Sequence, residues 1–362
     1  MSRYALGLVV GKFAPLHRGH EWLVAHAAAR CDRLLILSYS KPEFAGCGVE
    51  ARRAWLAARF PGHECLVVDD AWLREACAAH GIEPRAMPDN AEGDLVQQQF
   101  LAWLLRDALR RAPDAMFCSE AYGPPCAALL TRELGRRVDA VVVDQPRAAV
   151  PISATRLRAL LHGDRAAFAA ARAWLAPEVR ASFVRRVVLL GGESSGKTTL
   201  AAALAAHLGT SWVAEYGREL WEARAGRLDE ADLRAIGREQ VRREDAAARE
   251  AQGVLVCDTS PLTTAGYFLW TFDRSDPELE QLARRCYDAV VLCAPDFPFV
   301  QDGTRREAAF RLRQHAWYLE RLGAMDVPVF VAAGAPRERL EAVAAWLDAQ
   351  LTASTPDRPV AG

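Results

Sequence analysis

The sequence contains no apolar run close to the roughly 20 residues that a membrane-spanning helix requires. It also has little net charge: 45 Lys and Arg residues nearly balance 46 Asp and Glu residues, giving −1 at pH 7. No overall field therefore attracts nucleic acid or anionic lipid, and any phosphate group must be bound at a local site. The nine cysteines include no C-x-x-C pair, so we expect reduced thiols in a cytoplasmic protein and no zinc site.

What the sequence does contain is an alternation of short β-like runs and longer helical runs, which is typical of parallel α/β sheets. One series of strands begins near residue 4, and a second begins with RRVVLLG at Arg185. The stretch between the two series is short, mixed in composition and contains proline. The sequence therefore predicts an α/β protein with two parallel-sheet domains, residues 1–180 and 181–351, and a disordered tail over 352–362 that lacks apolar periodicity.

The expected elements can be stated as residue ranges. Strands are predicted over 4–10, 33–38, 64–69, 114–119 and 138–144 in the first half, and over 185–191, 211–217, 253–258, 288–294 and 327–333 in the second. Helices are predicted in the first half over about 19–31, 50–59 and 95–111, and from near Ser153.

A phosphate-binding loop is predicted directly after the strand-like run VVLLG. The following residues read GGESSGKT, which fits G-x-x-x-x-G-K-[ST], and the helix-like run TTLAAALAAHL comes next. Such a loop turns successive N–H groups toward phosphate oxygens, and the helix N-terminus adds positive potential. We expect Lys197 to reach the β- and γ-phosphates of ATP and Thr198 to bind Mg²⁺. The predicted nucleotide site comprises Gly191, Gly192, Glu193, Ser194, Ser195, Gly196, Lys197, Thr198 and Thr199.

Further polar residues accompany this loop. The strand GVLVCD ends in Asp258, as a Mg²⁺-binding carboxylate beside a P-loop does, although a strand-terminal aspartate can also be a helix cap. Glu215 and Arg218 stand where small-molecule kinases bind their acceptor, and a solvated helix start explains them equally well. Arg305, in QDGTRREAAFRLR, is a candidate lid residue, although such spacing more often marks a solvated helical face.

A second anion site is predicted in the first half, where GKFAPLHRGH follows a strand and leads into a helix. His17 and His20 are three residues apart and can share one helical face. Two imidazoles there can donate hydrogen bonds to phosphate oxygens without placing a fixed full charge in the site. Gly19 permits close approach of a ligand to the backbone at the helix N-terminus.

The run ISATRLR supplies a second group of anion-binding side chains. Ser153 resembles a helix N-cap, and Thr155 and Arg158 follow on the first turns. Hydroxyls, N–H groups and a guanidinium can then converge on one anion. A simple capped helix with a solvated arginine would explain this run if it stood alone.

Together these segments resemble the HxGH nucleotidyltransferases, in which the first histidine and an S-x-T-x-x-R helix grip the phosphates of ATP. With RRAWL, SEAYG, GGESSGKTT, AEYGRE and FPFVQDGTR in this order, the chain resembles the bifunctional nicotinamide-nucleotide adenylyltransferase/ribosylnicotinamide kinase (NadR-like) family over roughly Gly7 to Arg313. The resemblance implies a Rossmann-like HxGH nucleotidyltransferase domain followed by a P-loop NTPase-type kinase domain.

The resemblance also implies an activity for each domain. The C-terminal domain would use ATP to phosphorylate ribosylnicotinamide to nicotinamide mononucleotide, and the N-terminal domain would adenylylate that product to NAD, releasing pyrophosphate. Mg²⁺ bound by Thr198 and Asp258 is the expected cofactor, and these small molecules are the expected partners; self-association is left open. The implied adenylyltransferase site is Gly11, Lys12, Phe13, His17, His20, Ser153, Thr155 and Arg158, and the implied catalytic residues are His17, His20, Arg158, Lys197 and Asp258.

The acceptor-binding residues are less sharply defined. Candidates are Trp55, Glu215, Tyr216, Arg218, Asp302 and Arg305. A cationic nicotinamide ring favours an aromatic face, so Trp103, Tyr267 and Trp270 are further candidates, although large aromatics more often belong to a core. The family often has D-T-D after its second-half strand, whereas this chain has Asp258-Thr259-Ser260, which leaves open which group orients the ribose. Some relatives carry an N-terminal helix-turn-helix repressor domain; because the first strand begins near residue 4, we expect no sequence-specific DNA binding.

Two alternative functions remain at this point. The enzyme pair that completes coenzyme A also joins an HxGH transferase to a P-loop kinase, although AEYGRE and DGTR argue against it. A regulator that binds ATP and NAD without turnover would retain the same motifs.

Overall fold

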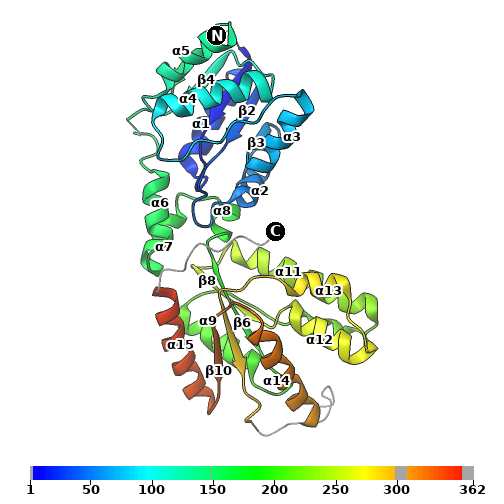
Figure 1. Cartoon of the computed structure of the whole chain (residues 1–362). Coiled ribbons are helices and arrows are strands. Elements are labelled where there is room, and N and C mark those ends of the chain that lie inside the picture. Colours follow the sequence, from blue (N-terminus) through cyan, green and yellow to red (C-terminus); the bar gives the residue numbers. More distant parts are fainter. Residues whose placement is uncertain (1–2, 147, 298–307, 353–362) are drawn as a thin grey trace.

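The computed structural model describes residues 3–146, 148–297 and 308–352. They form two five-stranded sheets, one in each lobe of an elongated molecule (Figure 1). Every strand pair among these residues is parallel. The predicted α/β architecture with two parallel sheets is therefore confirmed.

The N-terminal lobe has the strand order β3-β2-β1-β4-β5. Its strands are β1 (Tyr4–Val10), β2 (Cys31–Ser38), β3 (Glu64–Val67), β4 (Ala115–Cys118) and β5 (Asp139–Val142). Its helices are α1 (Arg18–Ala28), α2 (Val49–Arg59), α3 (Asp70–His80), α4 (Asp94–Trp103), the π-helical segment η1 (Leu104–Ala108) and α5 (Gly123–Leu134). The helices α6 (Ala154–Leu161), α7 (Arg165–Arg172) and α8 (Pro177–Ala181) then lead to the second lobe.

The C-terminal lobe has the strand order β10-β9-β6-β8-β7. Its strands are β6 (Arg185–Leu190), β7 (Trp212–Val213), β8 (Val254–Asp258), β9 (Ala289–Cys293) and β10 (Val329–Ala332). Its helices are α9 (Lys197–Leu208), α10 (Tyr216–Ala223), α11 (Glu230–Ala248), α12 (Pro261–Phe272), α13 (Pro277–Ala283), α14 (Ala308–Gly323) and α15 (Pro336–Thr352).

Each strand predicted from the sequence corresponds to an observed strand, but several predicted elements differ in extent. The helix predicted over about 19–31 ends at Ala28, and Cys31 already begins β2. The segment 211–217 is a strand only over β7, because Glu215 already has the N-cap position of α10. The segment 95–111 is not one regular helix, since α4 passes into η1, where the Leu109 N–H donates to the Leu104 carbonyl at 2.8 Å. This wider turn leaves both Leu104 and Leu105 fully buried.

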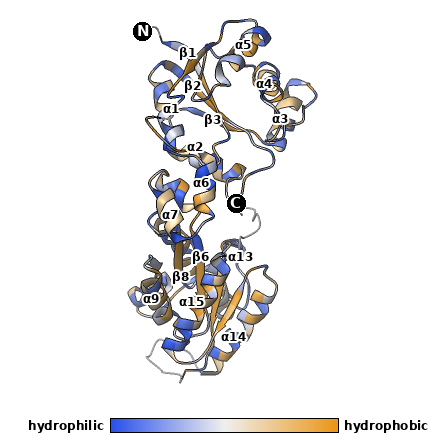
Figure 2. Cartoon of the chain, turned by 90° about the vertical axis from the view of Figure 1, so that its left-hand side faces the viewer, coloured by the Kyte–Doolittle hydropathy of each residue, from blue (hydrophilic) through white to orange (hydrophobic). Residues whose placement is uncertain are grey.

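The strands of the second sheet are apolar because helices cover both of its faces. All residues of β8 and β9 are buried. Leu200 of α9 and Leu347 of α15 belong to the core on one face, whereas Leu233 of α11 and Leu262 of α12 belong to the core on the other. Figure 2 shows the hydrophobic colour concentrated on strands that lie between helices with hydrophilic turns.

The first strand of each series lies inside its sheet. The strand β1 pairs with β2 on one side and β4 on the other, and β6 pairs with β8 and β9. In parallel sheets ligands bind beyond the carboxyl ends of the strands, where the strand order reverses. The loops that follow Val10 and Leu190 carry the two predicted phosphate motifs, so the topology places both motifs at such an end.

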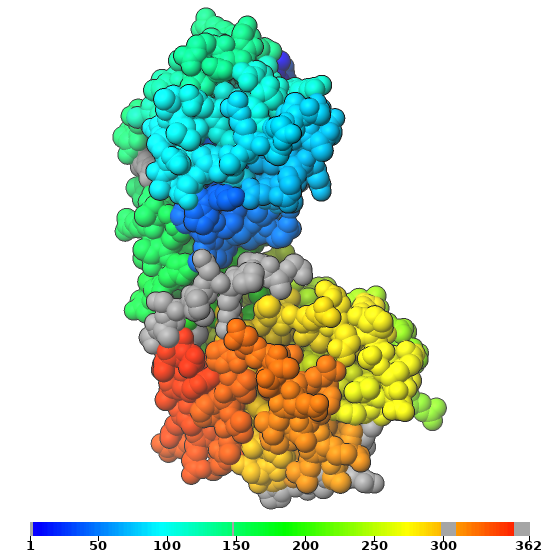
Figure 3. All heavy atoms as spheres, in the orientation of Figure 1, coloured from blue at the N-terminus to red at the C-terminus, as the bar shows by residue number. Residues whose placement is uncertain are grey.

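The connection between the lobes contains direct contacts. The Trp55 indole N–H of α2 donates to Ser182 Oγ at 2.9 Å, and Arg180 Nε donates to the Arg249 carbonyl at 3.0 Å. The predicted boundary near residue 180 falls in this connection, and Figure 3 shows the lobes on either side of it. The domain limits themselves stay a prediction.

No helix within the described ranges is long and apolar enough to cross a bilayer. The tail predicted from residue 352 lies outside the described residues, except for Thr352, at which α15 ends.

Candidate functional sites

The loop after β6 has the backbone conformation of a phosphate cradle. Gly191 and Gly196 have φ angles of 143° and 83°, and Ser194 has a φ of 58°. A Cβ at Gly191 would lie 2.7 Å from the Cys293 carbonyl oxygen, so the close packing of the loop against β9 requires glycine there. The loop leads directly into α9, whose first residue is Lys197. Lys197 Nζ donates to the carbonyl oxygens of Gly191 and Gly192 at 2.9 and 3.1 Å, so its ammonium group lies across the loop.

A buried arginine from the far end of the chain braces this loop, and the sequence reasoning missed it. Arg339 of α15 is 1% exposed and donates to the Ser195 carbonyl at 2.7 Å. It also donates to the Ala294 and Gly334 carbonyls at 3.1 and 3.0 Å and pairs with Asp296. The run RERLEAV around it looks like an ordinary amphipathic helix, so the sequence carried no signal for this role.

Asp258 lies at the end of β8, beside the P-loop strand, with Leu189 as its register partner. It is fully buried, and among the described residues neither of its carboxylate oxygens has a partner within hydrogen-bonding distance and angle. Burial raises the pKa of Asp258, whereas the positive charge of Lys197 and the nearby Thr198 hydroxyl lower it. A buried carboxylate with unused oxygens next to a threonine hydroxyl fits a hard cation such as Mg²⁺. The described residues contain no cluster of three or more His, Cys, Asp or Glu side chains around a metal position, so phosphate oxygens and water would have to complete the coordination.

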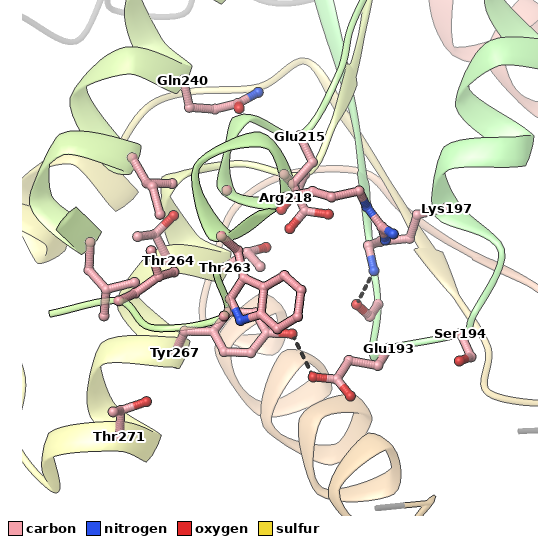
Figure 4. Close-up of a pocket in the computed structure, with 18 residues that line it drawn as sticks. Glu193, Ser194, Lys197, Glu215, Arg218, Gln240, Thr263, Thr264, Tyr267 and Thr271 are labelled. Carbon is pink, nitrogen blue, oxygen red and sulfur yellow. Dashed lines mark hydrogen bonds between the residues drawn. The ribbon is translucent and has the colours of Figure 1, made fainter. Parts of the chain in front are cut away.

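A cavity of about 320 Å³ opens beside the P-loop (Figure 4). Glu193, Ser194 and Lys197 of the loop form one side, and Glu215 and Arg218 lie on the α10 side. The remaining walls come from α10, α11, α12 and their connections. These lining residues are Gly217, Trp221, Gly226, Leu228, Leu233, Ile236, Gln240, Thr259, Thr263, Thr264, Tyr267 and Thr271; Gly191 of the P-loop also lines the cavity.

The structure sorts the acceptor-side candidates of the second half. Glu215, Arg218 and Tyr267 line the cavity. Tyr216 is not among the lining residues: its N–H donates to Gln240 Oε1 at 3.1 Å, and Arg243 lies 4.4 Å from its ring centre.

Trp270 also packs elsewhere, 5.1 Å from the ring of Trp317. Asp302 and Arg305 lie outside the described residues. The threonines of α12 and the α11 residues that line the cavity carried no recognisable motif and were missed.

Among the carboxyl groups that line this cavity, Glu215 is the one whose pKa is clearly shifted by its surroundings. Burial raises the pKa of Glu215; Lys197 and Arg218 lower it, and Asp258 and Glu193 raise it further. A carboxyl group with a raised pKa next to a phosphate-binding loop is suited to accept a proton from a hydroxyl group.

In the N-terminal lobe, the loop after β1 brings the two histidines together. His17 is the N-cap of α1, and its Nδ1 accepts from the Gly19 N–H at 3.1 Å. The rings of His17 and His20 stack with centroids 3.8 Å apart, and Phe13 contacts His20 edge-on at 4.9 Å. The two imidazoles therefore form one compact group at the N-terminus of α1, as their spacing predicts.

The second N-terminal motif meets the first. Ser153 caps α6 by accepting from the Arg156 N–H at 3.2 Å. Arg158 donates to the Ala14 carbonyl at 2.5 Å and to Thr155 Oγ1 at 3.2 Å. The helix that follows Ser153 thus packs on the histidine loop and brings the two motifs together. That they bind one anion stays a prediction.

Lys12 and Phe44 complete this group. Lys12 is exposed, and its Nζ donates to the Asn90 carbonyl at 3.2 Å. Partial desolvation of the ammonium group and the charge of Arg158 lower the pKa of Lys12. The Arg158 guanidinium lies 4.0 Å from the ring centre of Phe44, and Lys12 Nζ lies 6.0 Å from it. The sequence reasoning missed Phe44 and Asn90, because both lie in loops without a motif.

The two N-terminal tryptophans proposed as ring contacts are packed in the core. Trp55 is 1% exposed and lies 5.8 Å from the ring of Phe183, while its indole nitrogen is bonded to Ser182. Trp103 is 5% exposed and packs on Phe100. In this conformation neither ring presents a face to a ligand.

Known proteins resemble both the C-terminal lobe and most of the whole chain. Residues 186–339 match a family described as "AAA domain", and together with the loop geometry this identifies the C-terminal lobe as a P-loop nucleotide-binding domain. Over 321 residues the chain is 28% identical to the trifunctional NAD biosynthesis/regulator protein NadR of Salmonella typhimurium, covering 83% of this chain and 71% of the relative. It is also 28% identical over 319 residues to the protein of the same name from Escherichia coli, covering 84% and 72%.

Solved structures agree at the level of the fold. A crystal structure of NadR protein in complex with NR aligns with a TM-score of 0.69 at 18% identity, over 99% of both chains. A second, in complex with NAD and AMP-PNP, aligns with a TM-score of 0.66 at 18% identity, over 98% of this chain and 99% of the other. The resemblance to the NadR-like family that the motifs predicted is confirmed.

Proposed function

We propose that this chain makes NAD in two ATP-dependent steps, one in each lobe. The P-loop domain phosphorylates ribosylnicotinamide at its 5′-hydroxyl to nicotinamide mononucleotide. The N-terminal lobe, a Rossmann-like HxGH nucleotidyltransferase, transfers the adenylyl group of ATP to this product and releases pyrophosphate. One observation carries the proposal: a P-loop beside a cavity shares a chain with a second site in which Arg158 meets the loop of His17 and His20.

In the kinase step, the P-loop N–H groups and Lys197 hold the phosphates of ATP, and the cavity of about 320 Å³ holds the nucleoside. The acceptor hydroxyl attacks the γ-phosphorus in line, the bond from the γ-phosphorus to the bridging oxygen breaks, and ADP leaves. Glu215 takes the hydroxyl proton because its pKa is raised by burial. Lys197 offsets the negative charge on the moving phosphoryl group. Asp258 and Thr198 would hold Mg²⁺, which would neutralise part of the charge of the ATP phosphates.

In the adenylyl step, the mononucleotide phosphate attacks the α-phosphorus of ATP directly, and the P–O bond to pyrophosphate breaks. Hydrogen bonds from His17 and His20 and the charge of Arg158 stabilise the pyrophosphate as it leaves. Lys12 would bind the same anion; the charge of Arg158, which contributes to lowering the pKa of Lys12, supports this assignment. The protein needs no covalent intermediate, since its task is to align two anions and balance their charge.

The test is an incubation of the whole chain with ribosylnicotinamide, ATP and Mg²⁺, with mononucleotide and NAD followed by chromatography. Both should appear, the mononucleotide first. Omitting ribosylnicotinamide and supplying mononucleotide should give NAD alone.

Two outcomes would favour other functions. Consumption of pantetheine phosphate without formation of mononucleotide or NAD would point to coenzyme A synthesis. Binding of ATP and NAD without turnover of ribosylnicotinamide or nicotinamide mononucleotide would point to a regulator.

A further inference from the structure

Glu193 belongs to the P-loop by sequence, but its side chain faces the acceptor cavity. It is a lining residue, and the Tyr267 hydroxyl donates to Glu193 Oε1 at 3.0 Å across the cavity (Figure 4). Its backbone N–H donates to Gln314 Oε1 at 2.9 Å, and Gln314 is 1% exposed. Two helices, α12 and α14, thus hold both the backbone and the side chain of Glu193 in place.

A carboxylate is an unexpected group in a loop that binds anions. Backbone N–H groups and a helix N-terminus attract phosphate, and a nearby negative side chain opposes that attraction. The hydrogen bond from Tyr267 directs the negative group to the acceptor side. Burial raises the pKa of Tyr267 well above its usual range, and the negative charges of Glu193 and Glu215 raise it further, so the phenol stays a donor.

The charged groups of the cavity are arranged unevenly. In Figure 4, Arg218 extends toward Lys197, whereas the Glu193 carboxylate lies below the Tyr267 hydroxyl. Lys197 is bonded to the loop carbonyls and belongs to the phosphate end. Burial, Asp258 and, to a smaller extent, Glu193 raise the pKa of Glu215. The carboxyl groups of Glu193 and Glu215 therefore lie close enough in the cavity to affect each other's charge.

We propose that Glu193, positioned by Tyr267, is a specificity residue that favours a positively charged acceptor nucleoside over a neutral one. This inference rests on the proposed kinase activity. The negative potential of Glu193 acts on the charge of the acceptor ring and not on the phosphates of ATP. Tyr267 acts as a positioning residue for that carboxylate.

The experiment compares two acceptors that differ in ring charge. Ribosylnicotinamide is a pyridinium cation, and its reduced dihydropyridine form has the same sugar and amide but a neutral ring. In E193Q, the kcat/KM for the cationic nucleoside should fall about tenfold, as expected for loss of one charge at close range, and that for the neutral nucleoside about twofold or less. Y267F should change the same ratio in the same direction by a smaller factor.

Further measurements separate this role from a structural one. The KM for ATP should stay within about twofold of the wild-type value in E193Q, and so should the adenylyl step. Glu219→Gln is the matched control, because Glu219 is an exposed carboxylate of α10 that pairs with Arg243 and does not line the cavity. The control should leave the cation-to-neutral ratio unchanged.

Two results would overturn the inference. Equal losses for the two nucleosides in E193Q would make Glu193 a structural brace of the loop. A raised KM for ATP with unchanged acceptor preference would assign it to the nucleotide. If the wild-type protein phosphorylates neither nucleoside, the proposed kinase activity fails and the inference fails with it.

Discussion

The two lobes carry their predicted phosphate motifs at equivalent places in their sheets but assemble them in different ways. Each site follows a strand inside its sheet, β1 or β6. In the C-terminal lobe one contiguous loop supplies the cradle, the lysine and the helix N-terminus. In the N-terminal lobe the site forms only when Arg158 meets the carbonyl of Ala14, 144 residues earlier in the chain. The first site is therefore encoded locally, and the second depends on how the lobe folds.

The charges of the two sites also differ. The C-terminal site places a lysine beside a buried carboxylate, Asp258, which suits a metal-assisted phosphoryl transfer. The N-terminal site has two stacked imidazoles, with Lys12 and Arg158 nearby. Such a site offers hydrogen bonds and positive charge to a departing anion. If the two sites act independently, damage to one should spare the other.

The largest expected effect is that of Lys197→Ala. Loss of the ammonium group should lower mononucleotide formation by about a thousandfold, because it removes a preorganised positive charge from the transferred phosphoryl group. NAD formation from supplied mononucleotide should stay within about twofold. Parallel assays of the two half-reactions on one preparation provide the measurement, and loss of both activities would contradict the independence of the sites.

The mirror-image variant is His20→Ala. It should lower NAD formation from mononucleotide by about a hundredfold and leave the kinase step intact, since one donor to the anion is lost. His26→Ala is the control: His26 also lies in α1, but it contacts the Trp22 carbonyl at 3.0 Å and not the site. Similar losses in His20→Ala and His26→Ala would show that the helix, and not the imidazole, was damaged.

Arg339→Leu tests the brace of the C-terminal site. Removing this buried guanidinium takes away the charge partner of Asp296 and a hydrogen-bond donor to three carbonyl groups. We expect a loss of about 3 kcal/mol in the free energy of unfolding of the C-terminal lobe and about a tenfold weaker kinase. Thermal unfolding and the two half-reaction assays measure this.

The control for the brace is Arg337→Leu, two positions earlier in α15. Arg337 is exposed and pairs with Glu341, so its loss should change stability by about 0.5 kcal/mol or less. Equal destabilisation by both substitutions would remove the special role of Arg339.

The smallest expected difference is in pH dependence. Burial raises the pKa of both Asp258 and Glu215, so these groups take up protons at a higher pH than ordinary carboxyl groups. If the ionised forms are active, the kinase rate falls as pH decreases toward and through these raised pKa values. Higher Mg²⁺ should shift this decline to lower pH, because the cation favours the ionised carboxylate.

Initial rates of the two half-reactions between about pH 4.5 and 8 would measure this difference. Unfolding measured over the same range serves as the control. An acid limb that is identical for both half-reactions and insensitive to Mg²⁺ would contradict the assignment.

Motifs whose structure depends on a few neighbouring residues were predicted well. The strand and helix on either side of GGESSGKT were correct, because glycine torsions and a helix start can be recognised from a few neighbouring residues. The pairing of His17 with His20 followed from helical spacing alone. The position predicted for Asp258 is also observed, since β8 runs beside the P-loop strand and ends at this residue. Its role in binding Mg²⁺ stays a prediction.

Predictions that needed side-chain packing fared less well. Trp55 and Trp103 were plausible ring contacts by residue type, but the structure buries both. The sequence does not tell whether an aromatic side chain of a helix lines a cavity or packs in the core, because this depends on which faces of neighbouring helices and sheets pack together. For the same reason Tyr267 was indistinguishable from Trp270 before the fold was known.

The sequence by itself determined that two parallel α/β units follow each other and that each carries a phosphate motif after its first strand. Those features depend on short-range patterns of apolar residues, glycines and helix starts. Only the tertiary structure decided that Arg339 braces the P-loop, that Arg158 meets the histidine loop, and that Glu193 turns toward Tyr267. These contacts join segments far apart in the chain, and they exist only once two sheets and their covering helices have packed.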